Sequence, residues 1–237
     1  MKFETLQNGT RLYLDAGAFP LSTDAVLLAD YAQVTGRAAV CDLCAGAGAV
    51  GLLLLDRAPG LSVTALELQE AACGLMERSR AESRLEDRFR VLRGDLREIR
   101  SLLPPGSFRH VVCNPPYYPV GSGCAPEDEA QAIARTELCC RPEDFCAAAA
   151  WLLPTGGCFW LVHRPERLAE LCCALREASL EPKALRLVCP KSETAPSLLL
   201  IRAVKDGKPG LQWEAPLVLA NANGTPTEEY RRIYRME

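Results

Sequence analysis

Two features are scarce or missing in this sequence: it has only two histidines, and no apolar run is long enough to cross a membrane. A site built on several imidazoles is therefore excluded, and His110 and His163 are expected to be ordinary residues at strand ends. The chain opens with the polar stretch 1–4, where a secretory leader would need an apolar core. We expect a cytoplasmic protein without a membrane anchor.

An excess of positive charge is also missing, since 27 Lys and Arg residues face 30 Asp and Glu residues, for a net charge of -3. This total does not exclude RNA as a partner, because binding depends on the local field. Eight arginines stand against five acids between residues 78 and 100, and nine basic residues against six acids between 164 and 208. Each group can equally be a solvated helix face with pairs such as Arg78 and Glu82.

Cysteine, in contrast, is abundant, with twelve residues. A cytoplasmic chain keeps its thiols reduced, so disulfides are not expected. Cys41 and Cys44 have CxxC spacing, but no second such pair follows. Cys139-Cys140 and Cys172-Cys173 are adjacent pairs on predicted helices, where neighbouring side chains point to different sides. We therefore expect no metal site, and we interpret the thiols as small buried apolar residues.

The length of 237 residues and the hydrophobic fraction of 49% suit a single α/β domain with a good core. No internal repeat or heptad array is present. The most irregular stretch, around residues 118–130, is rich in Pro, Gly and acids. It predicts a mobile substrate loop, and an insertion without function is the alternative.

A glycine-rich turn follows the first predicted strand, within Val40 to Gly51. The strand ends at Asp42, and Gly46 and Gly48 lie in the turn that opens a helix. Small residues there let a cofactor approach the backbone. A nicotinamide or flavin site is the competing interpretation. Because an acid precedes the glycines and no second phosphate-binding feature is evident, the pattern favours a cofactor with a cationic amino-acid end.

Polar residues recur at the ends of the next predicted strands. Glu67 ends the strand 61–67, Asp95 ends the strand 89–95, and Asn114 follows the strand 108–113. In an open α/β sheet, ligands bind at this carboxyl edge. Glu67 is suited to two ribose hydroxyls, and Asp95 to an adenine amino group. Any one of these acids could instead be a helix N-cap or a turn residue.

The tetrad Asn114-Pro115-Pro116-Tyr117 points to methylation of a planar nitrogen that bears two hydrogens. Such a nitrogen is a poor nucleophile because its lone pair is delocalised. The Asn114 side-chain oxygen and the Pro115 carbonyl can accept its hydrogens, and Tyr117 offers a flat face for stacking. The alternative is a proline-rich turn after a strand. The tetrad does not distinguish an adenine amino group from a glutamine amide.

With these motifs the chain resembles the class I S-adenosyl-L-methionine-dependent methyltransferases, in their N6-adenine and glutamine N5 branch. The resemblance implies a Rossmann-like, seven-stranded sheet, mostly parallel with one antiparallel strand, and helices on both faces. It implies these roles: a cofactor loop at Asp42, Gly46 and Gly48, a ribose contact at Glu67, an adenine contact at Asp95, and an amino-group clamp at Asn114, Pro115, Pro116 and Tyr117.

The N-terminal segment, residues 1–36, also resembles this group, in which a helix capped near Thr23 or Asp24 packs over the cofactor. A plain capped amphipathic helix is the alternative. In the tail, a predicted helix at 142–153 and strands at 156–163, 184–189 and 197–204 surround the stretches VHRPERL and LEPKALRLV. This order looks like the tRNA1(Val) adenosine-37 N6-methyltransferase family.

The resemblance therefore implies methyl transfer to the N6 amino group of an adenine in tRNA, with the base flipped out of its loop onto Tyr117. One alternative is a glutamine N5-methyltransferase acting on a release factor. Such enzymes usually carry a helical N-terminal substrate domain, whereas about forty residues precede the cofactor loop here. The other alternative is a non-catalytic RNA-binding protein with this fold.

Overall fold

The computed structural model describes residues 2–14, 21–116 and 140–236. Tyr117, the predicted loop at 118–130 and Cys139 lie outside this range. The strands are β1 (Lys2–Thr5), β2 (Arg11–Leu14), β3 (Ala39–Leu43), β4 (Ser62–Glu67), β5 (Phe89–Arg93), β6 (His110–Cys113), β7 (Cys158–His163), β8 (Leu180–Lys191), β9 (Leu198–Lys205), β10 (Gln212–Trp213) and β11 (Leu217–Ala220). The helices are α1 (Thr23–Tyr31), α2 (Ala49–Arg57), α3 (Glu70–Glu82), α4 (Ile99–Leu102), α6 (Pro142–Leu152), α7 (Leu168–Glu177) and α8 (Glu228–Tyr234), with short 3-10 turns η1 (Leu96–Glu98) and η2 (Pro165–Arg167).

The central sheet has a seven-stranded core in the order β8-β9-β7-β6-β3-β4-β5. Within this core, β9 alone runs antiparallel to its neighbours β7 and β8. The short strands β10 and β11 both pair with β8 in parallel and extend the sheet to nine strands. The predicted core of seven strands with one antiparallel member is therefore confirmed, and the two edge strands are additions.

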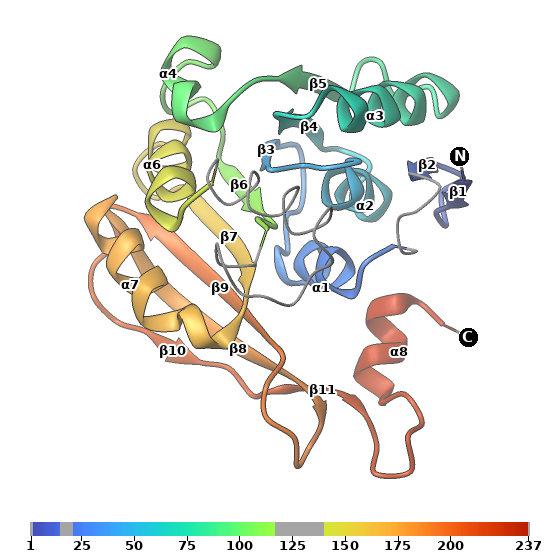
Figure 1. Ribbon diagram of the computed structural model, residues 1–237, viewed down its shortest axis with the longest axis vertical. Coiled ribbons are helices and arrows are strands. Elements are labelled where there is room, and N and C mark those ends of the chain that lie inside the picture. Colours follow the sequence, from blue (N-terminus) through green and yellow to red (C-terminus); the bar gives the residue numbers. More distant parts are fainter. Residues whose placement is uncertain (1, 15–20, 117–139, 237) are drawn as a thin grey trace, which may run out of the picture.

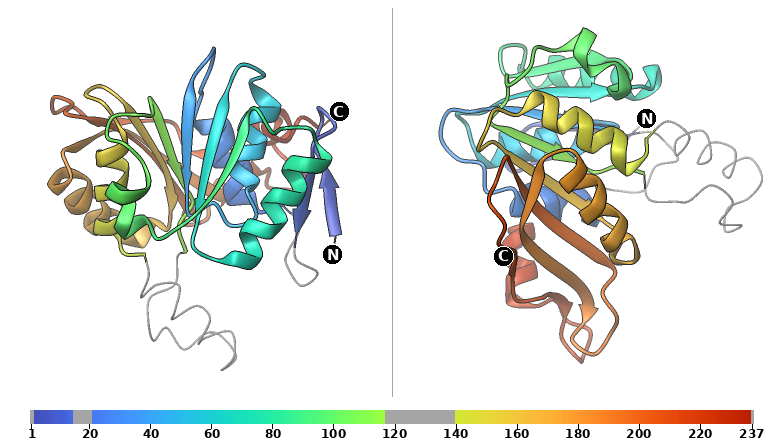
Figure 2. Two further views of the ribbon diagram at one scale, coloured as in Figure 1. Left: turned by 90° about the horizontal axis from the view of Figure 1, so that it is seen from above. Right: turned by 90° about the vertical axis from the view of Figure 1, so that its left-hand side faces the viewer.

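Helices cover both faces of this sheet, as predicted (Figure 2). On one face Leu28 of α1, Leu54 of α2 and Met76 of α3 belong to one buried cluster. On the other face Phe145 of α6 and Leu171 of α7 belong to a second. The inner strands β3, β4, β6 and β7 are buried over most of their length, as expected for parallel strands covered by helices. Within the described residues, no helix is long and apolar enough to span a membrane.

The structure departs from the predicted elements in the tail. The stretch 181–183 is part of β8, although the sequence placed it before a strand at 184–189. The register of β8 against β9 shifts between Pro182 and Ala184. Such an irregularity tolerates a residue without an N–H, so the proline does not end the strand.

Several small elements were not predicted at all. The hairpin β1-β2 pairs only with itself among the described residues, away from the main sheet. Helix α8 lies beside α1, and both chain ends are on that side of the molecule (Figure 1). Asn8, in the turn of the hairpin, and Arg235, at the end of α8, both hydrogen-bond to Asp56 of α2.

Candidate active site

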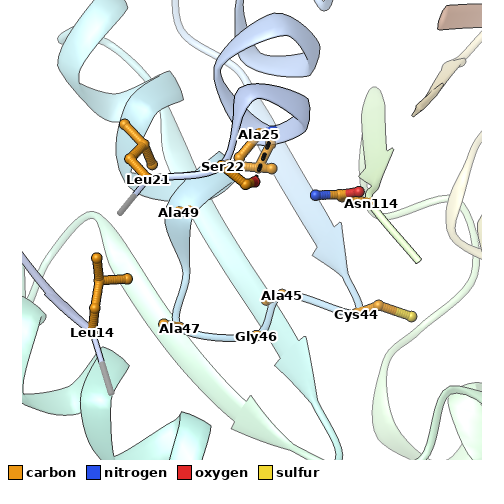
Figure 3. A pocket seen from close by; sticks show the side chains of 11 residues that line it. Leu14, Leu21, Ser22, Ala25, Cys44, Ala45, Gly46, Ala47, Ala49 and Asn114 are labelled. Carbon is orange, nitrogen blue, oxygen red and sulfur yellow. Dashed lines mark hydrogen bonds between the residues drawn. The ribbon is translucent and has the colours of Figure 1, made fainter. Parts of the chain in front are cut away.

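A cavity of about 320 Å³ opens at the carboxyl edge of the sheet. Figure 3 shows Leu14 and Leu21 on one side of this cavity, Asn114 on the other, and the loop 45–47 between them. The lining residues are Leu14, Leu21, Ser22, Ala25, Cys44, Ala45, Gly46, Ala47, Ala49, Val50 and Asn114. The structure therefore brings together the glycine loop, the asparagine of the tetrad and the N-terminal segment.

The loop between β3 and α2 takes backbone conformations that favour glycine. Gly46 has a φ of 55° and Gly48 a φ of 84°. A Cβ on Gly48 would lie 2.9 Å from Met76 Cγ and 3.1 Å from Phe89 Cζ, whereas a Cβ on Gly46 would meet nothing within 4 Å. Gly48 is therefore required for packing beneath the loop, and Gly46 keeps open the side that faces the cavity.

Asp42, at the end of β3, holds this loop from inside. Its Oδ2 accepts a hydrogen bond of 2.9 Å from the Gly51 N–H, and the residue is only 1% exposed. Its Oδ1 is buried without a hydrogen-bond partner among the described residues. Burial raises the pKa of Asp42 to about 7, against the opposing effect of the Gly51 hydrogen bond. One carboxylate oxygen is thus left for a polar or cationic group.

Glu67, at the end of β4, joins two loops. Its Oε2 accepts from the Gly46 N–H at 2.8 Å, and its Oε1 accepts from the Gln69 N–H at 2.9 Å. The residue is 8% exposed and lies behind the glycine loop rather than on the cavity wall. Each carboxylate oxygen retains a second lone pair for a ligand hydroxyl.

Asp95 lies two residues beyond β5, at the same edge of the sheet. It is the N-cap of η1, where its Oδ1 accepts from the Arg97 N–H at 2.9 Å. Its ion pair with the Arg97 side chain lowers the pKa of Asp95. The three acids thus lie at neighbouring strand ends, as predicted. Each of them also has the capping or loop-holding role that the sequence left as the alternative.

The tetrad begins directly after β6. Register pairs Leu43 with Cys113 across β3 and β6, so Asn114 follows at the level of Cys44, where the glycine loop begins. Asn114 is half-buried and lines the cavity, and Pro115 behind it is buried. The structure therefore brings Asn114 to the cofactor loop, and Tyr117 lies outside the described residues.

The start of helix α1 forms part of the cavity wall. Its N-cap is Ser22, whose Oγ accepts from the Ala25 N–H at 3.3 Å. The cap thus lies one residue before Thr23 and two before Asp24, the residues near which it was predicted. Ser22 and Ala25 line the cavity, whereas Thr23 and Asp24 do not. Thr23 instead lies near Tyr234 of α8, whose pKa is raised to about 12 mainly by burial.

Four residues line the N-terminal wall of the cavity, and sequence reasoning assigned none of them to the site: Leu14, Leu21, Ser22 and Ala25. The serine before Thr23-Asp24 was an available signal, because serine is among the best N-cap residues. Leu14 and Leu21 carried no such signal, since an apolar residue that lines a ligand cavity looks like any core residue.

The comparisons with known proteins agree with this geometry. A family model described as methyltransferase small domain matches residues 21–175. The chain belongs to this methyltransferase family. Two relatives are named tRNA1(Val) (adenine(37)-N6)-methyltransferase. The one from Bacteroides thetaiotaomicron is 29% identical over 93% of this chain and 91% of its own. The one from Shewanella amazonensis is 30% identical over 91% of this chain and 90% of its own.

A solved structure of a predicted O-methyltransferase, protein Atu636 from Agrobacterium tumefaciens, superposes with a TM-score of 0.75 at 24% identity. The match covers 90% of this chain and 96% of that chain, and it shows a shared fold. The predicted Rossmann-like class I methyltransferase fold is confirmed. The family resemblance stated from the sequence is confirmed by the family model and the relatives.

Thiols are concentrated near the candidate site of this methyltransferase. Cys44 lines the cavity, and its Sγ lies 3.4 Å from Cys140 Sγ. Burial raises the pKa of Cys113 to about 11, so this thiol is neutral at physiological pH. Five described cysteines are buried, but Cys173 is exposed, so the expectation of buried thiols holds only in part. Within the described ranges, no group of three or more possible metal ligands is assembled.

Proposed function

We propose that the protein transfers a methyl group from S-adenosyl-L-methionine to the N6 amino group of an adenine in tRNA. One observation carries the proposal: Asn114, the first residue of the tetrad, lines the same cavity as the glycine loop 44–47. A methyl donor in the loop and an amino group held by Asn114 would therefore meet. The names of the two relatives support tRNA adenine as the acceptor.

The residues in and around the cavity fit this cofactor. The small side chains of the loop allow close approach of a ligand to the backbone. The unpartnered Asp42 Oδ1 suits a cationic amino-acid end. Glu67 would accept from ribose hydroxyls, Asp95 from the adenine amino group, and Thr23 and Asp24 would support the helix above. When bound, S-adenosyl-L-methionine supplies an electrophilic methyl group on a sulfonium centre.

The chain's own contribution is orientation of the amino group. The Asn114 side-chain oxygen and the Pro115 carbonyl would each accept one amino hydrogen, which directs the nitrogen lone pair toward the cavity. Pro115 and Pro116 stiffen the backbone that presents these acceptors. Tyr117 would stack on the base. Once the nitrogen has accepted the methyl group, it releases one of its protons to solvent, so no histidine is required as a base.

The proposed acceptor is adenine rather than a glutamine amide. The relatives named as tRNA methyltransferases support this choice. Because tRNA is the proposed substrate, the cytoplasm is the proposed compartment.

The substitution Asn114→Ala tests this function. It removes one acceptor from the amino group and should lower methyl transfer to tRNA by at least about 100-fold, because misorientation of the nucleophile is costly. The affinity for S-adenosyl-L-methionine should change little. A calorimetric titration with the cofactor and a labelled-methyl assay measure the two effects. The exposed Asn223→Ala is the matched control and should retain both activities. Normal turnover by Asn114→Ala would remove the tetrad from the mechanism.

A further inference from the structure

Helix α8 lies outside the region matched by the family model, yet it contacts the elements that wall the cofactor cavity. It lies beside α1 (Figure 1), and Arg235 at its C-terminal end contacts Gln7 in the turn of the N-terminal hairpin. Its Ile233 is 2% exposed and belongs to the same buried cluster as the α1 and α2 side chains. The helix is thus packed into the core rather than appended to the surface.

Asp30 at the end of α1 is the first point of attachment. Arg57 of α2 donates from Nη1 to Asp30 Oδ1 at 2.8 Å, and Arg232 of α8 donates from Nη2 to Asp30 Oδ2 at 3.2 Å. Arg57 also donates from Nη2 to the Ile233 carbonyl at 2.8 Å. The Asp30 and Arg57 side chains are 16% and 17% exposed, so this pair is shielded from water. A shielded ion pair is less screened than a surface one.

Arg235 is the second point of attachment. Its Nη1 donates to Asp56 Oδ2 at 2.9 Å and to Gln7 Oε1 at 3.0 Å. Gln7 Nε2 donates back to the Arg235 carbonyl at 3.2 Å, and the Asn8 N–H donates to Asp56 Oδ1 at 2.8 Å. The turn of the hairpin β1-β2 is therefore fixed to α2 and to α8 at once.

These attachments reach the cavity through the N-terminal elements. Leu14 ends β2, and Ser22 and Ala25 begin α1; all three line the cavity. The hairpin also holds the start of α1, since the Leu21 N–H donates to Glu4 Oε1 at 3.0 Å. A two-stranded hairpin is marginally stable alone, so its position depends on what it is attached to.

The other end of α8 is anchored to the main sheet. Arg186 of β8 donates from Nη2 to both Glu229 carboxylate oxygens at 2.8 Å. The N-cap residue Thr227 donates from Oγ1 to the Val218 carbonyl of β11 at 2.7 Å. The helix thus spans from the β8-β11 side of the sheet to the N-terminal wall of the cavity.

We propose that α8 positions the N-terminal wall of the cofactor cavity, with Arg232 and Arg235 as positioning residues. Neither arginine lines the cavity. They act through Asp30, Asp56 and Gln7 on the helix and hairpin that do. The inference rests on the proposed function, because it assigns the cavity to S-adenosyl-L-methionine.

The double variant Arg232→Ala/Arg235→Ala tests this role. Its KM and Kd for S-adenosyl-L-methionine should rise by about fivefold or more, as expected for coupling between linked sites. The KM for tRNA and the kcat at saturating cofactor should stay within about twofold, since Asn114 is held by β6 and not by the N-terminal wall. Arg232→Lys/Arg235→Ala should recover part of the affinity through the Asp30 ion pair.

The matched control is Arg176→Ala, which removes an exposed ion pair with Glu181 at 3.7 Å, between α7 and β8. It should leave cofactor binding unchanged. Unchanged cofactor affinity in the double variant, in a protein with a cooperative thermal transition, overturns the inference. A fall in kcat together with equal rises in the KM values for cofactor and tRNA also overturns it, because this pattern indicates general destabilisation. Failure of the wild-type protein to bind S-adenosyl-L-methionine contradicts the proposed function itself and removes the inference with it.

Discussion

At the scale of single residues, the two carboxylate oxygens of Asp42 differ, because one accepts a structural hydrogen bond and the other has no described partner. Its Oδ2 holds the start of α2 through Gly51, and its Oδ1 is buried without a described partner. An isolated buried charge is costly, and a group in this position keeps its proton to a higher pH. Asp42 therefore costs the folded protein stability at neutral pH until a cation or a polar group meets it.

This cost predicts that the difference in the free energy of unfolding between the wild-type protein and Asp42→Asn depends on pH. The unfolded chain loses the Asp42 proton near pH 4, whereas the folded chain keeps it to about pH 7. Between these values the folded state binds more protons, so wild-type stability falls as pH rises. The fall is about 1.4 kcal/mol per pH unit relative to Asp42→Asn, and the difference is constant above about pH 7.

Urea unfolding of both proteins without cofactor, at pH 5 and at pH 7.5, measures this difference. The exposed Asp87→Asn is the control, and its stability difference from the wild type should be nearly the same at both pH values. A stability difference between wild type and Asp42→Asn that does not change over this window would show that the folded protein does not hold the proton.

The positions of Asp42, Glu67, Asp95 and Asn114 could be read from the sequence, because each follows or ends an apolar strand and parallel strands align their carboxyl ends. The hydrogen-bond partners of their side-chain oxygens could not be read from the sequence. Glu67 accepts from the backbone of Gly46 and of Gln69, and these contacts depend on the path of two loops. Nothing in local composition fixes that path.

At the scale of elements, the inner strands β3, β4, β6 and β7 were predictable because they are short, mostly apolar runs buried on both faces. The missed elements lack that signal. β10 has two residues, and the four-residue hairpin strands show a weak alternation. Helix α8 did carry a start signal, since its N-cap Thr227 precedes two acids. Its function as an attachment depends on contacts with residues more than 170 positions away, which no window of sequence reveals.

The glycine loop between β3 and α2 gives a matched pair of substitutions. Gly48→Ala should lower the free energy of unfolding by about 3 kcal/mol, because the methyl group meets Met76 and Phe89 and the backbone is left-handed. Gly46→Ala meets no neighbour and should cost about 1 kcal/mol from backbone strain alone. Its methyl group would instead crowd the cavity and weaken cofactor binding.

Urea unfolding of both variants measures the loss of stability, and a cofactor titration measures the loss of binding. Gly48→Ala should be the less stable protein. Gly46→Ala should stay folded and show the lower cofactor affinity per folded molecule. Equal losses of stability in the two variants would contradict the different packing of the two glycines.

At the scale of the whole molecule, the charge pattern is less basic than the sequence count between residues 78 and 100 suggests. Arg78, Arg80, Arg93 and Arg97 each pair with a nearby carboxylate. The pair of Arg78 with Glu82 is the i,i+4 contact expected of a solvated helix face. For these four arginines, the neighbouring carboxylates offset much of the positive charge.

In the proposed function, the carboxyl edge of the sheet brings a methyl donor together with an adenine amino group of tRNA. The most direct test combines the purified protein with S-adenosyl-L-methionine carrying a labelled methyl group and total tRNA from cells that lack the protein. The tRNA is then digested to nucleosides. We expect label in N6-methyladenosine, and at least about 100-fold less of it with Asn114→Ala. Unlabelled tRNA, together with label on a glutamine of a release factor in a parallel reaction, would contradict it.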